Sequence, residues 1–487
     1  MNQINKALTN PISRPVKVLQ FGEGNFLRGF VDYMIDIANE KGLFQGNIVI
    51  VKPIEHGTLT AFKKQDCQYT VSLRGLVEGN PGVINRQITS VEAVIDCYEE
   101  YSRFCQLASL EDLRFIISNT TEAGIVYDPC DSREYMPPRT FPGKLTEFLY
   151  RRYLHFQGDF SKGLIMLPVE LIDDNGIVLK QCVLDYIKLW NLESEFQLWV
   201  EKACIFTSTL VDRIITGYPK NEEEEWEKLG YRDSLLVTGE PFALWVIESN
   251  EDISQEFPLD KAGLPILFTT NQKPYKQRKV RILNGAHTSF VMASYLCGNN
   301  IVRASMEDET IFQFMKNTIF REIIPTLSLP KEELEQFAHE VILRFKNPYV
   351  DHSLLAISLN SVSKWRTRCL PSLQDYWNKY NVLPSHLTFS LAALAAFYHG
   401  KEIRDNALIA YRDKEEYTVI DDTQVLHFFQ KHYDSPVPVF LEDLLSQTSF
   451  WGRNLNEIPG FLEAVTGNYL DIQELGMRNA LCKLINE

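Results

Sequence analysis

The sequence predicts an α/β protein, with a parallel sheet and flanking helices in the N-terminal part and a mostly α-helical C-terminal domain. Three observations lead to this fold class. Short runs rich in Val, Ile and Leu recur before about residue 271, as expected for buried parallel strands. A glycine-containing turn links the first run to an amphipathic stretch with helical spacing. After that point strand-like runs become scarce, and amphipathic helical stretches dominate.

The N-terminal elements are predicted in a regular order. The first strand is Val16–Phe21, and the helix after it carries apolar residues at 26, 30, 34 and 37. Gly42 suits the C-terminal end of that helix, because glycine readily adopts a left-handed backbone conformation. Four further strands are predicted at Asn47–Val51, Leu113–Ile117, Gly163–Pro168 and Ala203–Thr207. Strands alternating with helices predict an expanded Rossmann-type domain.

The C-terminal part is predicted to be helical. Its amphipathic stretches are Ser289–Leu296, Asp308–Ile324, Lys331–Phe345 and Leu387–His399. We place the boundary so that residues 1–272 form a dinucleotide-binding Rossmann domain and residues 273–487 a substrate-binding and catalytic domain, with the active site between them. The acidic run Glu222–Glu227 is predicted as a solvated helix face.

Composition restricts the classes of function. The chain has 487 residues, 45% of them hydrophobic and 23% charged, as in ordinary globular proteins. Its formal net charge of −15 argues against nucleic-acid binding, which needs a basic surface. The nine cysteines form no close metal-type pair and are odd in number, which predicts reduced thiols in a cytoplasmic protein. Neither a signal peptide nor a membrane span is recognisable, and no obligate protein partner is evident.

A phosphate-binding turn is predicted after the first strand. Its two glycines let the backbone approach a pyrophosphate, and the start of the helix supplies N–H donors. Leu27 stands where the common dinucleotide fingerprint has its third glycine. An ordinary strand-to-helix turn is the alternative. The candidate cofactor-binding residues here are Gly22, Gly24, Asn25, Phe26 and Arg28.

The residues at the ends of two further strands are relevant to cofactor binding and to the choice between NAD and NADP. The second strand usually ends near an acid that binds a ribose hydroxyl, but here it ends at Lys52, and the nearest acid is Glu55. Lys52 can face a 2′-phosphate or be a solvated surface residue, so the choice between NAD and NADP stays open. Thr121 and Glu122 follow a later strand, where ligands of open α/β sheets bind. They are candidate cofactor-binding residues, although such residues also form plain turns.

Lys279, Asn284 and His287 form the candidate catalytic group. On an α-helix with about 100° per residue, Asn284 and His287 share one face, and Lys279 lies about 80° from His287. A solvated lysine, with a pKa of about 10.4, is a poor base at neutral pH, but burial lowers that pKa. Asn284 can donate to an oxygen that gains negative charge, and His287 can orient it. Each residue type alone is more often structural; together the three can polarise a carbonyl and move a proton without a metal, while a dinucleotide supplies the hydride.

Segments along most of the chain resemble the polyol-specific long-chain dehydrogenases, the mannitol dehydrogenase family. The Lys/Asn/His pattern is the most specific of them. The segments are Gly22–Arg28, Thr121–Gly124, Phe141–Leu145, Val211–Ile214, Glu240–Phe242 with Trp245, Lys279–His287, and Arg344–Pro348 with Lys364.

Within the family, Val18–Phe30 and Leu167–Gly176 are most similar to members that reduce keto-hexuronates. The resemblance implies NAD as the cofactor, a small hexuronate or aldonate substrate, and metal-independent hydride transfer with Lys279 as the acid/base. It places Lys364 at the substrate carboxylate; a surface lysine is the alternative.

Two departures from the family pattern concern the substrate pocket. Polyol-acting members carry an asparagine where Leu171 stands here, and Asn175 is a candidate replacement. An arginine shortly before the lysine that matches Lys364 has no clear counterpart. The sequence leaves open a member that acts on an epimeric keto-hexuronate or on mannitol. It also leaves open a nucleotide-binding regulator without turnover, although the complete Lys/Asn/His set argues against that.

Overall fold

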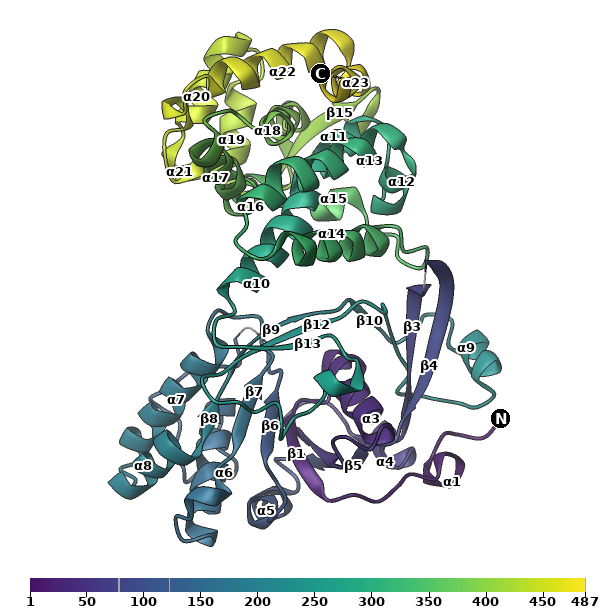
Figure 1. Ribbon diagram of the computed structural model, residues 1–487, viewed down its shortest axis with the longest axis vertical. Coiled ribbons are helices and arrows are strands. Elements are labelled where there is room, and N and C mark those ends of the chain that lie inside the picture. The colour runs from purple at the N-terminus through teal and green to yellow at the C-terminus, as the bar shows by residue number, and fades with distance from the viewer. Residues whose placement is uncertain (78, 122, 487) are drawn as a thin grey trace. The chain divides into compact units, whose positions relative to one another are not determined.

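A computed structural model describes residues 1–77, 79–121 and 123–486. The chain divides into two compact units, Met1–Gln272 and Lys273–Glu487. Among the described residues, the first unit contains a six-stranded sheet and two smaller sheets, and the second is mostly helical (Figure 1). The predicted fold class is confirmed.

The six-stranded sheet is parallel throughout, with the order β5-β2-β1-β6-β7-β8. Numbered by their order along the chain, these strands run 3-2-1-4-5-6, the arrangement of dinucleotide-binding Rossmann folds. Ligands of such sheets bind at the carboxyl ends of the strands, where the order reverses, here between β1 and β6. The strands are β1 (Val16–Phe21), β2 (Asn47–Lys52), β5 (Val91–Asp96), β6 (Phe115–Ser118), β7 (Ile165–Pro168) and β8 (Ile205–Phe206).

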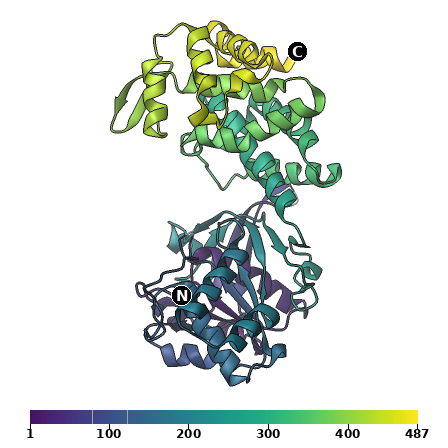
Figure 2. The same cartoon turned by 90° about the vertical axis from the view of Figure 1, so that its left-hand side faces the viewer.

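Successive residues of β1 point to opposite sides of the sheet. Val18 packs into a hydrophobic core with α3 (Tyr33–Glu40). Leu19 and Phe21 pack into a second core with three helices, which lie in front of the sheet in Figure 2. Gln20 therefore shares the side of Val18, where it is a fully buried polar residue. The three helices are α6 (Phe141–His155), α7 (Asn175–Leu189) and α8 (Ser194–Ala203).

The two smaller sheets have the orders β10-β11-β3-β4 and β13-β12-β9. Hydrophobic periodicity does not mark their strands, because most of them are short and β4 is largely exposed. They are β3 (Tyr69–Val77), β4 (Asn80–Ile88), β9 (Ser208–Asp212), β10 (Ile215–Gly217), β11 (Val237–Gly239), β12 (Leu244–Glu248) and β13 (Ile266–Thr269). The remaining helices of this unit are α1 (Lys6–Thr9), α2 (Asn25–Leu27), η1 (Arg28–Asp32), α4 (Thr60–Lys64), α5 (Tyr101–Gln106), η2 (Leu107–Ser109), η3 (Phe160–Lys162), α9 (Glu222–Leu229) and η4 (Asp260–Ala262).

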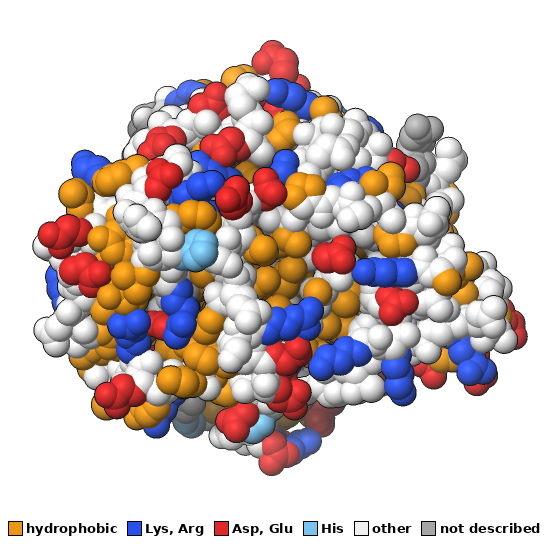
Figure 3. Space-filling model, turned by 90° about the horizontal axis from the view of Figure 1, so that it is seen from below, with side chains coloured by type: hydrophobic (Ala, Val, Ile, Leu, Met, Phe, Trp, Pro, Cys, Tyr) orange, Lys and Arg blue, Asp and Glu red, His pale blue; other side chains and the backbone are white. Residues whose placement is uncertain are grey.

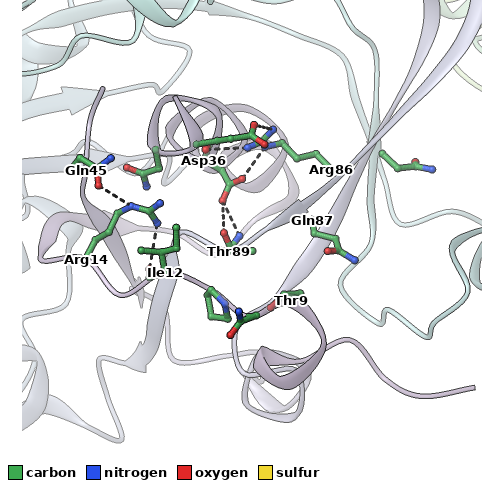
Figure 4. Close-up of a pocket in the computed structure, with 13 residues that line it drawn as sticks. Thr9, Ile12, Arg14, Asp36, Gln45, Arg86, Gln87 and Thr89 are labelled. Carbon is green, nitrogen blue, oxygen red and sulfur yellow. Dashed lines mark hydrogen bonds and ion pairs between the residues drawn. The ribbon is translucent and has the colours of Figure 1, made fainter. Parts of the chain in front are cut away.

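Charged side chains of the first unit are extensively paired. The acidic run forms α9, but one of its residues, Glu225, is buried against Arg74 instead of solvated. A polar hollow between the N-terminal segment, α3 and β4 contains a second group (Figure 4). There Arg86 lies 2.8 Å from oxygens of both Asp36 and Glu40. The face seen in Figure 3 mixes acidic, basic and hydrophobic side chains, so its charge is not of one sign.

The second unit is built around two helices with almost wholly buried side chains, α11 (Gly285–Leu296) and α18 (Ser385–Phe397). Helices that are apolar all round belong in the centre of a domain. The predicted helix Lys331–Phe345 is α14, with the same bounds, whereas the predicted helix Asp308–Ile324 is divided into α13 (Glu309–Asn317), η6 (Thr318–Ile323) and η7 (Ile324–Thr326). No helix within the described residues combines the length and apolar character that a membrane span requires.

The other elements of the second unit surround these helices. A three-stranded antiparallel sheet is formed by β14 (Gly400–Arg404), β15 (Ala407–Arg412) and β16 (Glu415–Val419). The helices are α10 (Lys273–Arg278), η5 (Lys279–Asn284), α12 (Val302–Glu307), α15 (Leu354–Ile357), α16 (Ser361–Arg368), α17 (Leu370–Tyr380), α19 (Thr423–Lys431), α20 (Val437–Ser446), α21 (Thr448–Trp451), η8 (Leu455–Glu457), α22 (Phe461–Leu475) and α23 (Met477–Asn486).

Candidate active site

The glycine turn lies directly after β1. Gly22 has a φ of +120°, and a Cβ there would lie 3.1 Å from the carbonyl oxygen of Asn119, which follows β6. Only glycine fits this close approach between the ends of the two central strands. Gly24 is exposed, and a Cβ on it would meet nothing within 4 Å. The turn therefore leaves open space in front of the backbone N–H groups at the start of α2, as a cofactor pyrophosphate needs.

Arg28, a candidate cofactor-binding residue, is buried and used to hold the turn. Its Nε donates to the carbonyl of Glu23 at 3.2 Å, and one Nη donates to Oδ1 of Asn25 at 2.6 Å. The other Nη donates to the carbonyl of Leu235. Phe26, another candidate, stacks on the ring of Phe30 in the core. The backbone at Gly24 is thus open to a cofactor, whereas Gly22 is buried and its N–H donates to the carbonyl of Val51 at 3.0 Å. Arg28 and Phe26 fix the shape of the turn.

A network of buried polar side chains holds the glycine turn in place. Gln20 donates from Nε2 to the carbonyl of Gly22 at 3.2 Å and to Oδ2 of Asp32 at 3.5 Å. The Tyr69 hydroxyl also donates to this carboxyl group, at 2.5 Å. Burial raises the pKa of Asp32 to about 7, although both hydrogen bonds oppose the shift. Sequence reasoning missed Asp32, because an acid within an apolar helical stretch gives no local signal of its partners.

Thr121 and Glu122 follow β6. Thr121 has a φ of +76°, which is unusual for a β-branched residue and typical of constrained functional loops. The buried carboxylate of Glu170 holds this loop, accepting hydrogen bonds from the Ser118 hydroxyl and from the backbone N–H and hydroxyl of Thr120. Sequence reasoning also missed Glu170, although it lies just after β7 in a segment with the family resemblance. Glu122 lies outside the described residues.

Lys52 does not face a solvent-exposed phosphate site. Its ammonium lies 2.9 Å from Oδ2 of Asp96, and only 1% of its side chain is exposed. It also donates to the carbonyls of Glu55, His56 and Gly57 at 3.0–3.3 Å. The interpretation of Lys52 as a solvated lysine is therefore wrong. The engagement of its ammonium group within the fold argues against a 2′-phosphate ligand.

Asn175 does not replace the missing family asparagine. It is fully buried, and its Nδ2 donates to the carbonyls of Pro168, Glu170 and Thr209 at 3.0–3.2 Å. Its Oδ1 accepts from the backbone N–H groups of Gly176 and Thr209. The amide therefore joins strand ends and has no group left for a substrate oxygen. Leu171, at the family position itself, is 65% exposed.

Lys279 and Asn284 lie at the two ends of η5, a π-helical turn. Hydrogen bonds of a π-helix connect residues five positions apart, and such turns are frequent at functional sites. The offset of five between Lys279 and Asn284 therefore places them one turn apart on the same side. Gly285 begins α11 directly after Asn284, so His287 follows on its first turn. Lys279 and Asn284 are half-buried, and no described residue forms a hydrogen bond with the side chain of Asn284.

His287 is held by aromatic contacts. Its ring stacks on Phe345 with a centroid distance of 4.1 Å and meets His352 edge-on at 5.7 Å. The buried Nε2 atom has no hydrogen-bond partner among the described residues. Burial lowers the pKa of His287 well below its ordinary value, and His352, Arg344, Arg368 and Lys364 lower it further. The imidazole is therefore neutral at pH 7 and has one ring nitrogen available to a ligand.

Lys364 and Arg368 lie one turn apart on α16. The Lys364 ammonium donates to the carbonyl of Ile357 at 2.9 Å, and burial and Arg368 lower its pKa, whereas Asp421 opposes the shift. Arg368 reaches Oγ1 of Thr288, the neighbour of His287, at 3.5 Å. The spacing of four residues from Lys364 places Arg368 on the same helix face and is the sequence signal that points to it.

Metal ligands were not expected at this site. Among the described residues, no group of three or more His, Cys, Asp and Glu side chains has an arrangement that can hold a metal ion. The absence of a metal requirement stays a prediction.

The two units match known families. Residues 16–261 match the family model of the mannitol dehydrogenase Rossmann domain, and residues 271–473 match that of the mannitol dehydrogenase C-terminal domain. The chain belongs to the mannitol dehydrogenase family. The resemblance inferred from the motifs is confirmed, and with it the enzyme class, an oxidoreductase that acts on CH–OH groups.

Two relatives are similar over nearly the whole chain. The altronate oxidoreductase of Phocaeicola vulgatus is 44% identical over 481 residues, which cover 98% of both chains. That of Bacillus subtilis strain 168 is 42% identical over 486 residues, covering 99% of this chain and 98% of the relative.

Two solved structures show the same fold at lower identity. A D-sorbitol dehydrogenase in substrate-free form has a TM-score of 0.78 at 20% identity, covering 98% of this chain and 100% of the other. Mannitol 2-dehydrogenase of Pseudomonas fluorescens, in a ternary complex with NAD and D-mannitol, has a TM-score of 0.65 at 20% identity over 100% of both chains.

Proposed function

We propose that this protein is an NADH-dependent reductase that converts D-tagaturonate to D-altronate and catalyses the reverse oxidation. The observation that carries the proposal is the neutral His287, with a buried and unpartnered Nε2, on the helical turn that follows Lys279 and Asn284. This set suits a carbonyl oxygen that accepts a proton. The choice of substrate is supported by relatives named altronate oxidoreductase at 42–44% identity over nearly the whole chain.

Three residues of the chain bind the keto oxygen of the substrate or give it a proton. When bound, NADH supplies the hydride that the keto carbon accepts, leaving NAD⁺. Lys279 in its ammonium form gives the proton that turns the keto oxygen into a hydroxyl group, and it regains a proton from solvent. Asn284 donates a hydrogen bond to the same oxygen as its negative charge grows. His287 orients that oxygen through Nε2 without adding a charge of its own.

The cofactor is held, in this proposal, by the glycine turn. Gly22, Gly24 and Asn25 lie at the pyrophosphate, with Thr121 beside the end of β6; Glu122 is included because it follows Thr121 in the sequence. NAD is favoured over NADP because Lys52 is fully engaged within the fold. The acidic groups nearby, Glu23 in the turn and Asp96, disfavour an additional phosphate. Burial raises the pKa of Glu23, while Lys52 and Arg28 oppose that shift.

A substrate panel tests the proposal. The protein is assayed with NADH and with NADPH on D-tagaturonate, D-fructuronate and D-fructose. We expect the highest kcat/KM with D-tagaturonate and NADH. A higher value with D-fructuronate assigns the epimeric reaction, and a higher value with D-fructose assigns a mannitol dehydrogenase. If none of the three supports NADH oxidation, the protein is a nucleotide-binding regulator and the proposal is wrong.

A further inference from the structure

Arg368 is a half-buried arginine without an acidic partner among the described residues. One Nη lies 3.5 Å from the Thr288 hydroxyl, and burial lowers the pKa of the guanidinium without an opposing carboxylate. Two other arginines of the same unit differ from it. Arg278 and Arg281 pair with Glu333 and Asp375 at 2.6 and 2.5 Å. Removing a guanidinium from water is costly unless an anion compensates for it. The partly buried Arg368 is therefore expected to bind an anion, and no described residue supplies one.

The fold fixes Arg368 beside the catalytic helix. A Cβ on Gly285 would lie 3.2 Å from the carbonyl oxygen of Arg368, so glycine allows the end of α16 to approach the start of α11. The Cys369 thiol contacts the carbonyl of Gly285 at 3.6 Å from the same side. Arg368 is therefore held against the first turn of α11, which carries His287.

The surroundings of Arg368 are cationic, although the chain is acidic. Burial is the largest cause that lowers the pKa of His287. Four nearby groups lower it further by charge repulsion: His352, Arg344, Arg368 and Lys364. The net charge of the whole chain is −15, so such a gathering of positive groups is local. The buried Nε2 of His287 in the same place lacks a hydrogen-bond partner among the described residues, so a polar ligand can supply one. The combination fits a substrate that carries both a hydroxyl or keto oxygen and an anionic group.

Lys364 is the less suitable of the two residues of α16 for that anion. Its ammonium is already bonded to the carbonyl of Ile357, and the nearby carboxylate of Asp421 raises its pKa. Arg368 has neither a carbonyl nor a carboxylate partner among the described residues. In addition, the planar guanidinium matches the two oxygens of a carboxylate, whereas an ammonium is a single point of charge.

We infer that Arg368 binds the carboxylate of the substrate and sets the preference for a sugar acid over a neutral sugar, and that Lys364 positions the segment before α16. The inference rests on the proposed function and names the residue that recognises the acid group. It also supplies an arginine for a pocket whose family arginine has no counterpart in the sequence.

The test compares Arg368→Gln with Arg366→Gln, an exposed arginine of the same helix. Each variant is assayed with NADH on D-tagaturonate and on D-tagatose, in which a hydroxymethyl group replaces the carboxylate. A lost charge-assisted hydrogen bond lowers kcat/KM for D-tagaturonate by about 10- to 100-fold in Arg368→Gln. We expect the values for D-tagatose, and both values in Arg366→Gln, to stay within about twofold of the parent.

Two further variants separate binding from a structural role. Arg368→Lys keeps the charge but loses the planar fork, so we expect it to recover part of the preference. Lys364→Gln is expected to lower kcat/KM for D-tagaturonate and for D-tagatose by the same factor. Equal losses on both substrates in Arg368→Gln, or a preference that disappears in Lys364→Gln and persists in Arg368→Gln, would overturn the inference.

The parent protein distinguishes failure of the function from failure of the inference. If the parent turns over D-tagaturonate and D-tagatose equally, the proposed substrate is wrong. If the parent prefers D-tagaturonate and Arg368→Gln retains the preference, only the inference is wrong. Calorimetric binding of D-altronate gives a readout independent of turnover: we expect the Kd to rise by the same factor in Arg368→Gln. Failure of the parent to bind D-altronate contradicts the inference as well.

Discussion

The ammonium of Lys52 and the carboxylate of Asp96 form a buried ion pair at the carboxyl ends of β2 and β5, with 2.9 Å between Nζ and Oδ2. Their side chains are 1% and 7% exposed. The pair occupies the region where Rossmann folds bind the adenosine ribose. Lys52, the cation at the end of β2, is therefore a structural group.

Lys52→Met is expected to lower the free energy of unfolding by about 3–5 kcal/mol, because it leaves the buried carboxylate of Asp96 uncompensated. The ratio of kcat/KM for NADH to that for NADPH should not change. Urea unfolding and steady-state assays measure the two effects, with the exposed Lys64→Met as control. A selective loss of NADPH use in Lys52→Met would show that this lysine contacts the cofactor after all.

Lys279→Met is expected to lower kcat by at least about 100-fold, the usual contribution of a positioned proton-transfer group. NADH binding should persist, because the glycine turn belongs to the other unit. Stopped-flow turnover and fluorescence titration with NADH measure the two quantities, and the exposed Lys316→Met serves as control. Near-normal kcat across the pH range would remove Lys279 from the reaction.

Asp32→Asn is expected to flatten the pH dependence of stability. The pKa of Asp32 is about 7 in the folded chain against an ordinary value of 3.8, so the folded state holds the extra proton between these values. Its contribution is present at low pH and is lost as pH rises through 7. Between pH 5 and 8 the parent should lose about 3 kcal/mol more than the variant. Denaturant unfolding at both pH values measures this, and identical losses would contradict it.

His287→Asn is expected to change stability in the opposite pH direction. The pKa of His287 is lowered well below 6.5 when folded, so the unfolded chain binds the proton first as the pH falls. The stability due to the neutral imidazole is present above about pH 6.5 and is lost as pH falls below it. The parent should therefore lose more unfolding free energy than His287→Asn between pH 7.5 and 5.5. Parallel curves would mean that the imidazole ionises in the folded protein as readily as in water.

Treatment with a strong chelator, followed by assay in chelated buffer, is expected to leave the reduction rate unchanged. Lys279 provides the acid/base that a metal-bound water would otherwise supply. The metal content of the purified protein is measured in parallel. Loss of activity that returns on addition of Zn²⁺ would overturn the metal-independent mechanism.

Local periodicity was sufficient for much of the fold. The strand Val16–Phe21 and the helix Lys331–Phe345 have the predicted bounds, because alternation and helical spacing are recorded in adjacent residues. The predicted helix after the glycine turn is present, but η1 interrupts it with a π-helical turn. The short and exposed strands of the smaller sheets were missed, because their pairing partners, rather than their own sequence, hold them in place.

Patterns of neighbouring residues were sufficient to predict the parallel sheet, the helical C-terminal part and the glycine turn, and to propose Lys279, Asn284 and His287 as the candidate catalytic group. The roles of the neighbouring charged and polar groups could be read only from the folded chain. It engages Lys52 with Asp96 and Asn175 with the strand ends, and it leaves Arg368 without a carboxylate among the described residues. The physical reason is that backbone periodicity depends on neighbours in sequence, whereas the partner of a buried charge is whichever distant residue the fold brings within a few ångströms.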